Sequence, residues 1–207
     1  MRCTFGRAVR RQVTNPRQSE AAYWFKTGVF MKLVSLTSLA LGAVMLAGCG
    51  GSGGGSREEA REEAALDLLE RAERTDVTPE AAMPTSGTAS YTGYAGFSEG
   101  SAFDANDVEA LGDFNMTADF AGSGVRGRVD GLRETGTGRS ISGGVDLAGN
   151  ISGNEMSGTL AGTVNGGATT GDFDGVFGGA AHELVGGTMT GTITGEQFGG
   201  IFVGEKR

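Results

Sequence analysis

The sequence predicts an all-β fold for residues 87–207, a small eight-stranded antiparallel up-and-down β-barrel. Two observations predict it. Apolar and polar residues alternate with a period of two in one short segment after another, which is typical of half-buried strands. The connections between these segments are short and often contain Gly, Asn or Asp, as β-hairpins require, so each strand is expected to run antiparallel to the next.

The alternation is clearest at residues 112–120, where Phe114, Met116 and Phe120 are separated by polar residues. Residues 87–207 contain 30 of the 39 glycines and no proline, a composition that would favour disorder if this alternation were absent. Eight segments are expected to be strands, namely residues 88–97, 112–120, 123–131, 139–148, 155–165, 170–178, 187–195 and 197–204.

One face of these strands carries the large apolar side chains and many glycines, and the other carries mainly Ser, Thr, Asn, Asp and Arg. A barrel inserted in a membrane would be apolar outside and polar inside, so the pattern excludes a pore. The glycines either make room for large side chains inside a narrow barrel or mark bulges and bends, and both interpretations stay open. Six side chains are expected to point inward, namely Phe114, Phe120, Phe173, Phe177, Phe198 and Phe202.

A short apolar run precedes a cysteine in the N-terminal part of the chain. The run, residues 33–47, has about the length of a signal-peptide core and is too short to span a bilayer comfortably. It ends in Leu46-Ala47-Gly48-Cys49, which matches a lipobox, in which small residues permit cleavage and the thiol accepts the lipid. Residues 31–48 are therefore expected to be a lipoprotein signal peptide. Cys49 is expected to be the first mature residue and the lipidation site, and its acyl chains, such as palmitate, would anchor the protein in a membrane.

Residues 1–30 are basic and show no clear periodicity. They are expected either to result from a start codon assigned too early, with Met31 as the true start, or to form a genuine N-terminal extension. Under both interpretations they lie outside the mature protein.

Residues 49–86 are expected to form a tether between the lipidated Cys49 and the barrel. Gly50–Gly55 has the composition of a flexible Gly/Ser linker, and Ser56 with Glu59 forms a capping box that would begin a helix. The tether would close with residues 75–86, which contain two prolines.

The predicted helix carries two favourable i,i+4 pairs, Asp67 with Arg71 and Glu70 with Arg74. Its apolar stripe is thin, so we expect a solvated helix that acts as a spacer. A partner-binding or coiled-coil helix is the alternative. The stripe consists of Ala60, Ala64, Leu68 and Ala72.

The charge changes sign at the predicted cleavage point. Residues 1–48 hold one acidic and seven basic residues of the chain's 25 and 17, so the mature part has 24 acidic and 10 basic residues, a net charge of −14. Such a surface repels nucleic acid and anionic headgroups, which excludes nucleic acid as a partner. Membrane attachment is then expected to depend on lipid alone.

The C-terminal part resembles a known family. Residues 171–191 read GDFDGVFGGAAHELVGGTMTG, in which a strand ends in an aromatic residue and Gly, a short turn with Ala and Glu follows, and small residues open the next strand. This is similar to the barrel signature of the transferrin-binding-protein-like surface lipoproteins. The matching positions are Phe177, Gly178, Ala181, Glu183, Leu184 and Gly186 and, in the closing GGIFVGEKR, Phe202, Gly204 and Lys206.

The opening GTASYTGYAG is also similar to the family's first barrel strand. The chain departs from the family at Gly179, where Pro is common, and at Val185, where a small residue is usual. Large members have two lobes, each with a handle domain beside its barrel, and this chain has one barrel and no room for a handle. The resemblance therefore implies the barrel fold and a role as a surface lipoprotein, but it does not imply the family's ligand.

Few residues have the pattern of a catalytic or metal-binding site. His182 is the only histidine, is expected to be exposed in a turn, and has no second His or free Cys with which to bind a metal. Asp172 and Asp174 are expected to lie on a strand's acidic outer face rather than in a calcium site. A further acidic cluster in the loop after the first strand is expected to be solvated, although it could hold a cation or contact a partner; it consists of Asp104, Asp107 and Glu109.

We therefore predict that the protein is not an enzyme and uses no metal and no cofactor. Tyr91 and Tyr94 are expected on opposite faces of the first strand, one in the barrel wall and the other at the rim, where it could line a ligand patch.

Two function classes remain. The first is a surface-anchored bacterial lipoprotein whose barrel binds a host or extracellular protein or a small ligand. The second is a structural envelope lipoprotein with no ligand of its own. Because Gly50 rather than Asp follows the cysteine, we expect the outer membrane and the cell surface as the location, with the protein as a monomer.

Overall fold

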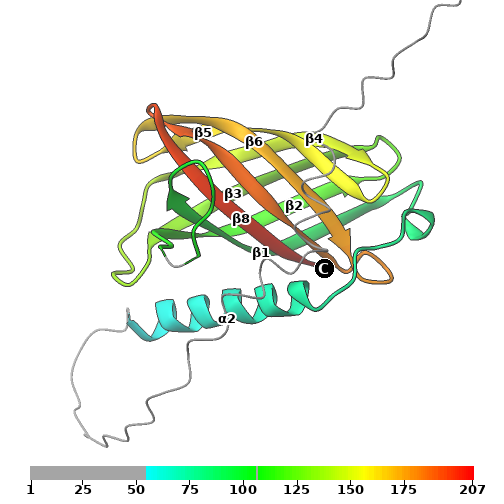
Figure 1. Cartoon of the computed structure of the whole chain (residues 1–207), viewed down its shortest axis with the longest axis horizontal. Coiled ribbons are helices and arrows are strands. Elements are labelled where there is room, and N and C mark those ends of the chain that lie inside the picture. Colours follow the sequence, from blue (N-terminus) through cyan, green and yellow to red (C-terminus); the bar gives the residue numbers. More distant parts are fainter. Residues whose placement is uncertain (1–54, 106) are drawn as a thin grey trace, which may run out of the picture.

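The computed structural model describes residues 55–105 and 107–207 (Figure 1). The predicted signal peptide, Cys49 and residues 50–54 of the linker lie outside these residues, as does the N-terminal extension. The elements follow in the order α2 (Gly55–Glu73), the short 3-10 helix η3 (Glu80–Ala82), β1 (Thr88–Glu99), β2 (Ala110–Asp119), β3 (Gly124–Glu134), β4 (Gly143–Ser152), β5 (Glu155–Val164), β6 (Gly167–Gly178), β7 (Leu184–Ile193) and β8 (Glu196–Lys206).

The eight strands form a closed antiparallel barrel in which each strand pairs with the next along the chain, and β8 pairs with β1. The register that closes the barrel runs from Tyr91 opposite Lys206 to Glu99 opposite Phe198. The predicted fold class is therefore confirmed. Figure 1 shows the strands tilted in one sense around the barrel, with α2 lying along the outside.

The barrel interior is filled by apolar side chains. All six phenylalanines that the alternation placed inside belong to this core. The ring of Phe202 lies over two glycines that face each other across β6 and β7, Gly175 and Gly187. A Cβ on either glycine would lie 2.8 or 2.6 Å from the Phe202 ring, so the missing side chains make room for it. The other interpretation of the glycines, that they mark bulges, applies at Gly112, because the β2–β3 register shifts between Leu111 and Asp113.

Three strands begin three or four residues away from the predicted start, including the sixth, which was expected from residue 170 and begins at Gly167. The fourth was expected from residue 139 but begins at Gly143, because Glu134 and Arg139 pair at the end of a longer hairpin connection. The seventh was expected from residue 187 but begins at Leu184. Its two glycines at 186 and 187 therefore lie within the strand rather than before it.

One face of helix α2 is buried against the barrel, so the prediction of a solvated spacer helix is wrong for that face. Leu68 and Ala72 are buried against Leu184 and Val203 on the outside of the barrel, with Tyr94 packed beside them. The thin apolar stripe is sufficient to hold α2 on the barrel, because its small residues allow the helix to approach the strands closely. Of the two predicted i,i+4 pairs, Glu70–Arg74 forms, at 2.8 Å. No helix in the described part of the chain is long and apolar enough to cross a membrane.

The segment after α2 also binds to the barrel. Val77 pairs with Gly178, the last residue of β6. Thr78 is fully buried, its N–H donates to the Phe177 carbonyl at 2.8 Å, and its hydroxyl donates to the Gly179 carbonyl at 2.7 Å. The Asn154 amide donates to the Thr78 carbonyl at 2.7 Å. This part of the predicted tether is therefore part of the folded domain.

Candidate functional site

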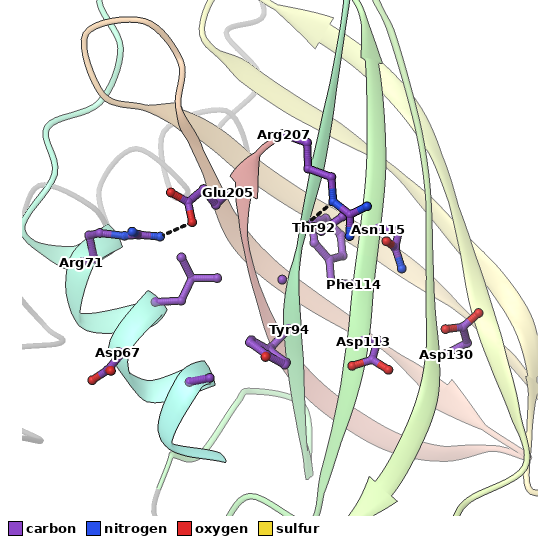
Figure 2. Close-up of a pocket in the computed structure, with 13 residues that line it drawn as sticks. Asp67, Arg71, Thr92, Tyr94, Asp113, Phe114, Asn115, Asp130, Glu205 and Arg207 are labelled. Carbon is purple, nitrogen blue, oxygen red and sulfur yellow. Dashed lines mark hydrogen bonds and ion pairs between the residues drawn. The ribbon is translucent and has the colours of Figure 1, made fainter. Parts of the chain in front are cut away.

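A groove of about 740 Å³ lies between α2 and the outer face of the barrel (Figure 2). Helix α2 forms one wall, and strands β1, β2 and β3 form the floor, with the end of β8 beside them. The lining residues are Ala64, Asp67, Leu68 and Arg71 from the helix and Thr92, Gly93, Tyr94, Asp113, Phe114, Asn115, Asp130, Glu205 and Arg207 from the strands and the residue after β8.

The sequence places these side chains by two periodicities. Residues 64, 67, 68 and 71 share one helix face, because positions three and four apart are neighbours on a helix surface. On the floor, strand register aligns Tyr94 with Asp113 and Asp113 with Asp130, and it aligns Thr92 with Asn115 in the next row. One of the two tyrosines of β1 was expected to lie in the barrel wall and the other at the rim. Tyr91 is fully buried in the core, whereas Tyr94 lies outside it and lines the groove.

A network of ion pairs fixes the N-terminal half of the helix wall. Arg61 donates to Asp113 at 2.9 Å and to the Gly131 carbonyl at 3.0 Å. Its side chain is only 13% exposed, and Glu58 lies 3.7 Å away and also pairs with Arg133 at 3.5 Å. Because these groups are only partly hydrated, they bind the helix more firmly than fully exposed pairs would.

Arg71 closes the other end of the groove in a way that the sequence did not predict. The expected Asp67–Arg71 pair is not among the contacts formed by the described residues, because Arg71 instead pairs with Glu205 at 2.6 Å. Arg207 lies over the floor and donates to the Thr92 hydroxyl at 3.0 Å, as Figure 2 shows. Within residues 55–105 and 107–207, the Asp67 carboxylate and the side-chain amide of Asn115 form no hydrogen bond.

One end of the barrel is covered by the β6–β7 turn, which contains His182. The turn spans Gly179–His182. His182 is not simply exposed: its ring packs edge-on against Phe120 at 5.3 Å, and Lys206 Nζ lies 2.7 Å from its Nε2. Burial and then the positive charge of Lys206 lower the pKa of His182. Its Nδ1 is buried without a partner among the described residues.

The predicted acidic clusters are separate from the groove. Asp172 and Asp174 are exposed on the outer face of β6, as expected. Burial, followed by repulsion from Glu99 and Asp107, raises the pKa of Glu109 in the loop after β1. The described residues contain no group of three or more His, Cys, Asp or Glu side chains that could hold a metal ion.

The sequence did not predict the groove itself. Its floor residues alternate along strands in the expected way, but only the packing of α2 turns that surface into a groove. The one available signal was the spacing of Ala64, Leu68 and Ala72, four residues apart, which favours close contact between a helix and another surface.

A closed antiparallel barrel with a filled interior and a polar outer face defines this part of the chain as a small β-barrel domain. The family profile described as the C-lobe and N-lobe β-barrels of Tf-binding protein B matches residues 83–206. The chain therefore belongs to this family of β-barrels.

Solved structures of similar proteins include a Trp-176-Ala mutant of transferrin-binding protein B from Haemophilus parasuis, with 18% identity, a TM-score of 0.46, and coverage of 63% of this chain and 28% of that one. Isotype 1 transferrin-binding protein B from serogroup B Neisseria meningitidis has 17% identity, a TM-score of 0.44 and the same coverage. The N-lobe of lactoferrin-binding protein B from Moraxella bovis has 12% identity, a TM-score of 0.39, and coverage of 60% of this chain and 61% of that one. This chain thus spans under a third of the first two structures, and the search of curated proteins gave no match.

Proposed function

We propose that this protein is a bacterial surface lipoprotein, held at the outer membrane by acyl chains on Cys49, whose barrel is a binding module and not an enzyme. The observation that carries the proposal is the family match over residues 83–206, which covers the whole barrel. The lipobox at residues 46–49 supports the anchor, and the polar outer face of the strands supports a barrel that stands in water.

The binding surface is the outside of the barrel. Phe114, Phe173 and Phe202 pack against one another inside it, with centroid distances of 4.9 Å and 6.2 Å to the Phe202 ring. A core filled in this way leaves the outer groove and the connecting loops as the surfaces that can recognise a partner.

The first experiment tests binding. The mature chain is immobilised and exposed to host serum, with purified transferrin, lactoferrin and haem as separate probes. We expect retention of at least one component that an immobilised control barrel of similar charge does not retain. Retention of nothing above this control would favour the structural envelope lipoprotein instead.

The second experiment tests the anchor and the location. Cys49→Ala should move the protein from the membrane fraction to the soluble fraction, and radiolabelled palmitate should enter only the wild-type protein. Protease added to intact cells should digest the wild-type barrel. Membrane retention of the Cys49→Ala variant would contradict the anchor, and full protection of the barrel would place it on the periplasmic side.

A further inference from the structure

We infer that α2 sets the orientation of the barrel at the membrane, so that one end of the barrel faces the lipid surface and the other faces the aqueous side. The near end carries the β1–β2, β3–β4, β5–β6 and β7–β8 connections, and the far end carries the β2–β3, β4–β5 and β6–β7 turns together with the end of β8. The inference rests on the lipid anchor at Cys49 that is proposed above.

The start of α2 is held at the near end of the barrel. Glu58 pairs with Arg133, close to the last residue of β3, at 3.5 Å. The Glu62 carboxylate accepts a hydrogen bond of 3.4 Å from the Gly136 N–H, in the connection between β3 and β4. Arg61 adds hydrogen bonds to β2 and β3. The first turns of the helix therefore lie beside the near end.

The segment that follows α2 is held at the far end. Val77 pairs with Gly178, the last residue of β6, and the Thr78 N–H donates to the Phe177 carbonyl at 2.8 Å. Figure 1 shows the same path, in which α2 runs along the length of the barrel and the chain then reaches the end that holds the C-terminus. If α2 were not packed on the strands, the chain would leave the barrel at Val77, from the far end. The docked helix thus moves the point of attachment from the far end to the near end.

The length of the tether makes this position decisive. Gly55 lies six residues after Cys49, and six residues span at most about 22 Å. Strands of 10–12 residues, tilted as in a barrel, give a barrel length of about 25–30 Å, and a helix of 19 residues is about 28 Å long. A barrel that stood with its far end on the lipid would hold Gly55 farther from the membrane than the tether reaches. The docked helix therefore excludes the inverted orientation.

The charge of the molecule opposes an orientation in which α2 lies flat on the lipid. The helix contains seven acidic residues and three arginines, and Glu59 and Glu63 are exposed on it. The near end also carries carboxylates, on Glu99, Glu109 and Glu134. An anionic lipid surface repels such a helix and such an end. The near end therefore faces the lipid without binding to it, and the far-end turns stay open to the aqueous side.

The experiment compares the distances of the two ends from the lipid by resonance energy transfer. The lipidated mature protein is added to preformed phosphatidylethanolamine–phosphatidylglycerol vesicles with an acceptor dye on a small share of the headgroups. A donor dye is attached to Ser101→Cys in the β1–β2 connection or to Ala180→Cys in the β6–β7 turn, both at exposed positions. Transfer from residue 101 should be about twofold more efficient or better, because the two ends differ in height by about 25–30 Å.

A double variant tests whether α2 causes the difference. Leu68→Ala with Arg61→Ala removes an apolar contact and an ionic contact of the helix, so the attachment point should move to Val77 at the far end. The difference between the two labelled positions should then disappear or reverse. Leu66→Ala with Arg74→Ala is the matched control on the same helix, because both side chains are exposed, and it should keep the wild-type difference.

Two outcomes would overturn the inference. The first is equal or stronger transfer from residue 180 in the otherwise unchanged protein, a comparison that does not depend on the folding of the double variants. The second is the same difference in the Leu68–Arg61 variant and its control, with hydrogen exchange showing α2 released only in the former. Either result in a lipidated, vesicle-bound protein contradicts the orientation alone. A protein that carries no lipid and does not bind the vesicles contradicts the proposed anchor, and the inference fails with it.

Discussion

The interior of the barrel and the interface between α2 and the barrel differ in chemistry. The largest side chains buried in the interior are almost all apolar, and aromatic rings account for much of the packing. The α2–barrel interface combines four buried apolar residues, Leu68, Ala72, Leu184 and Val203, with ion pairs that are partly exposed. The interior should therefore respond mainly to lost packing, and the interface to both lost packing and salt.

The difference indicates two levels of stability. The barrel closes on itself through strand pairing all the way round, so it does not need α2 to complete its sheet. Helix α2 depends on a small contact area and on charges that salt screens. We therefore expect conditions in which α2 detaches while the barrel remains folded, and the predictions below test this, starting with the largest expected effect.

Phe202→Ala should cause the largest loss of stability. The Phe202 side chain is 1% exposed and its ring packs against Phe114 and Phe173, so truncation loses transfer energy and leaves a cavity beside two glycines. Such truncations cost about 3–5 kcal/mol, which is a large part of a small domain's stability. Thermal unfolding by circular dichroism provides the measurement.

Thr190→Ala on the outer face of β7 is the control for Phe202→Ala and should change the melting temperature little. If Phe202→Ala melted like wild type, the assignment of the inner and outer faces would be contradicted.

Leu68→Ala should have a smaller effect that is confined to the interface. Leu68 is buried between α2 and the barrel, and its loss should cost about 2 kcal/mol, at the low end for Leu→Ala because the site lies at an edge. Faster hydrogen exchange in α2, with unchanged exchange in β4 and β5, would show that only the helix detaches. Leu66→Ala on the same helix is the control, because Leu66 is 62% exposed. Equal loss of protection throughout the barrel would contradict two separate levels of stability.

Arg61→Ala should weaken the interface by about 1–2 kcal/mol, because it removes the partner of Asp113 and leaves the partly buried Glu58 with Arg133 alone. Arg74→Ala breaks the exposed Glu70–Arg74 pair and should cost at most a few tenths of a kcal/mol. Limited proteolysis within α2 at low and high salt measures both variants. An Arg61→Ala variant no more sensitive to protease than Arg74→Ala would show that the ion network contributes nothing.

The smallest expected effect is a pH dependence at the β6–β7 turn. His182 has a lowered pKa in the folded protein, so the unfolded chain binds its proton more readily, and the stability from neutral His182 is fully present above its usual pKa of 6.5. That stability is lost as pH falls below 6.5 through the folded pKa. Lys206 opposes protonation and Glu183 favours it.

His182→Gln should show a weaker dependence of melting temperature on pH between about 7 and 5 than wild type does. A histidine NMR titration with a midpoint above 6.5 would contradict the direction of the shift.

The same division between interior and interface explains how far the sequence could predict the structure. Inward-facing residues such as Phe114 follow from alternation along a single strand, which needs no knowledge of neighbours. The Arg71–Glu205 pair and the burial of Thr78 depend on which distant segment lies opposite, and no local pattern contains that information. The late start of β4 has a similar cause, because the Glu134–Arg139 pairing sets the length of the connection. The groove could not be predicted either, because it forms only where α2 packs against strands that are distant in the sequence.

The closure between β1 and β8 also has a consequence for the order of folding. The chain is synthesised from its N-terminus, so β1 is complete long before residues 196–206 are made. Those residues form β8, which pairs with β1 along one edge and with β7 along the other. Pairing across so long a stretch of chain is slow, because loop-closure entropy must be overcome first. Until β8 arrives, β1 and β7 each have an unpaired edge that can pair with another molecule. Any delay or early stop in translation before β8 should therefore cause aggregation rather than a smaller folded barrel.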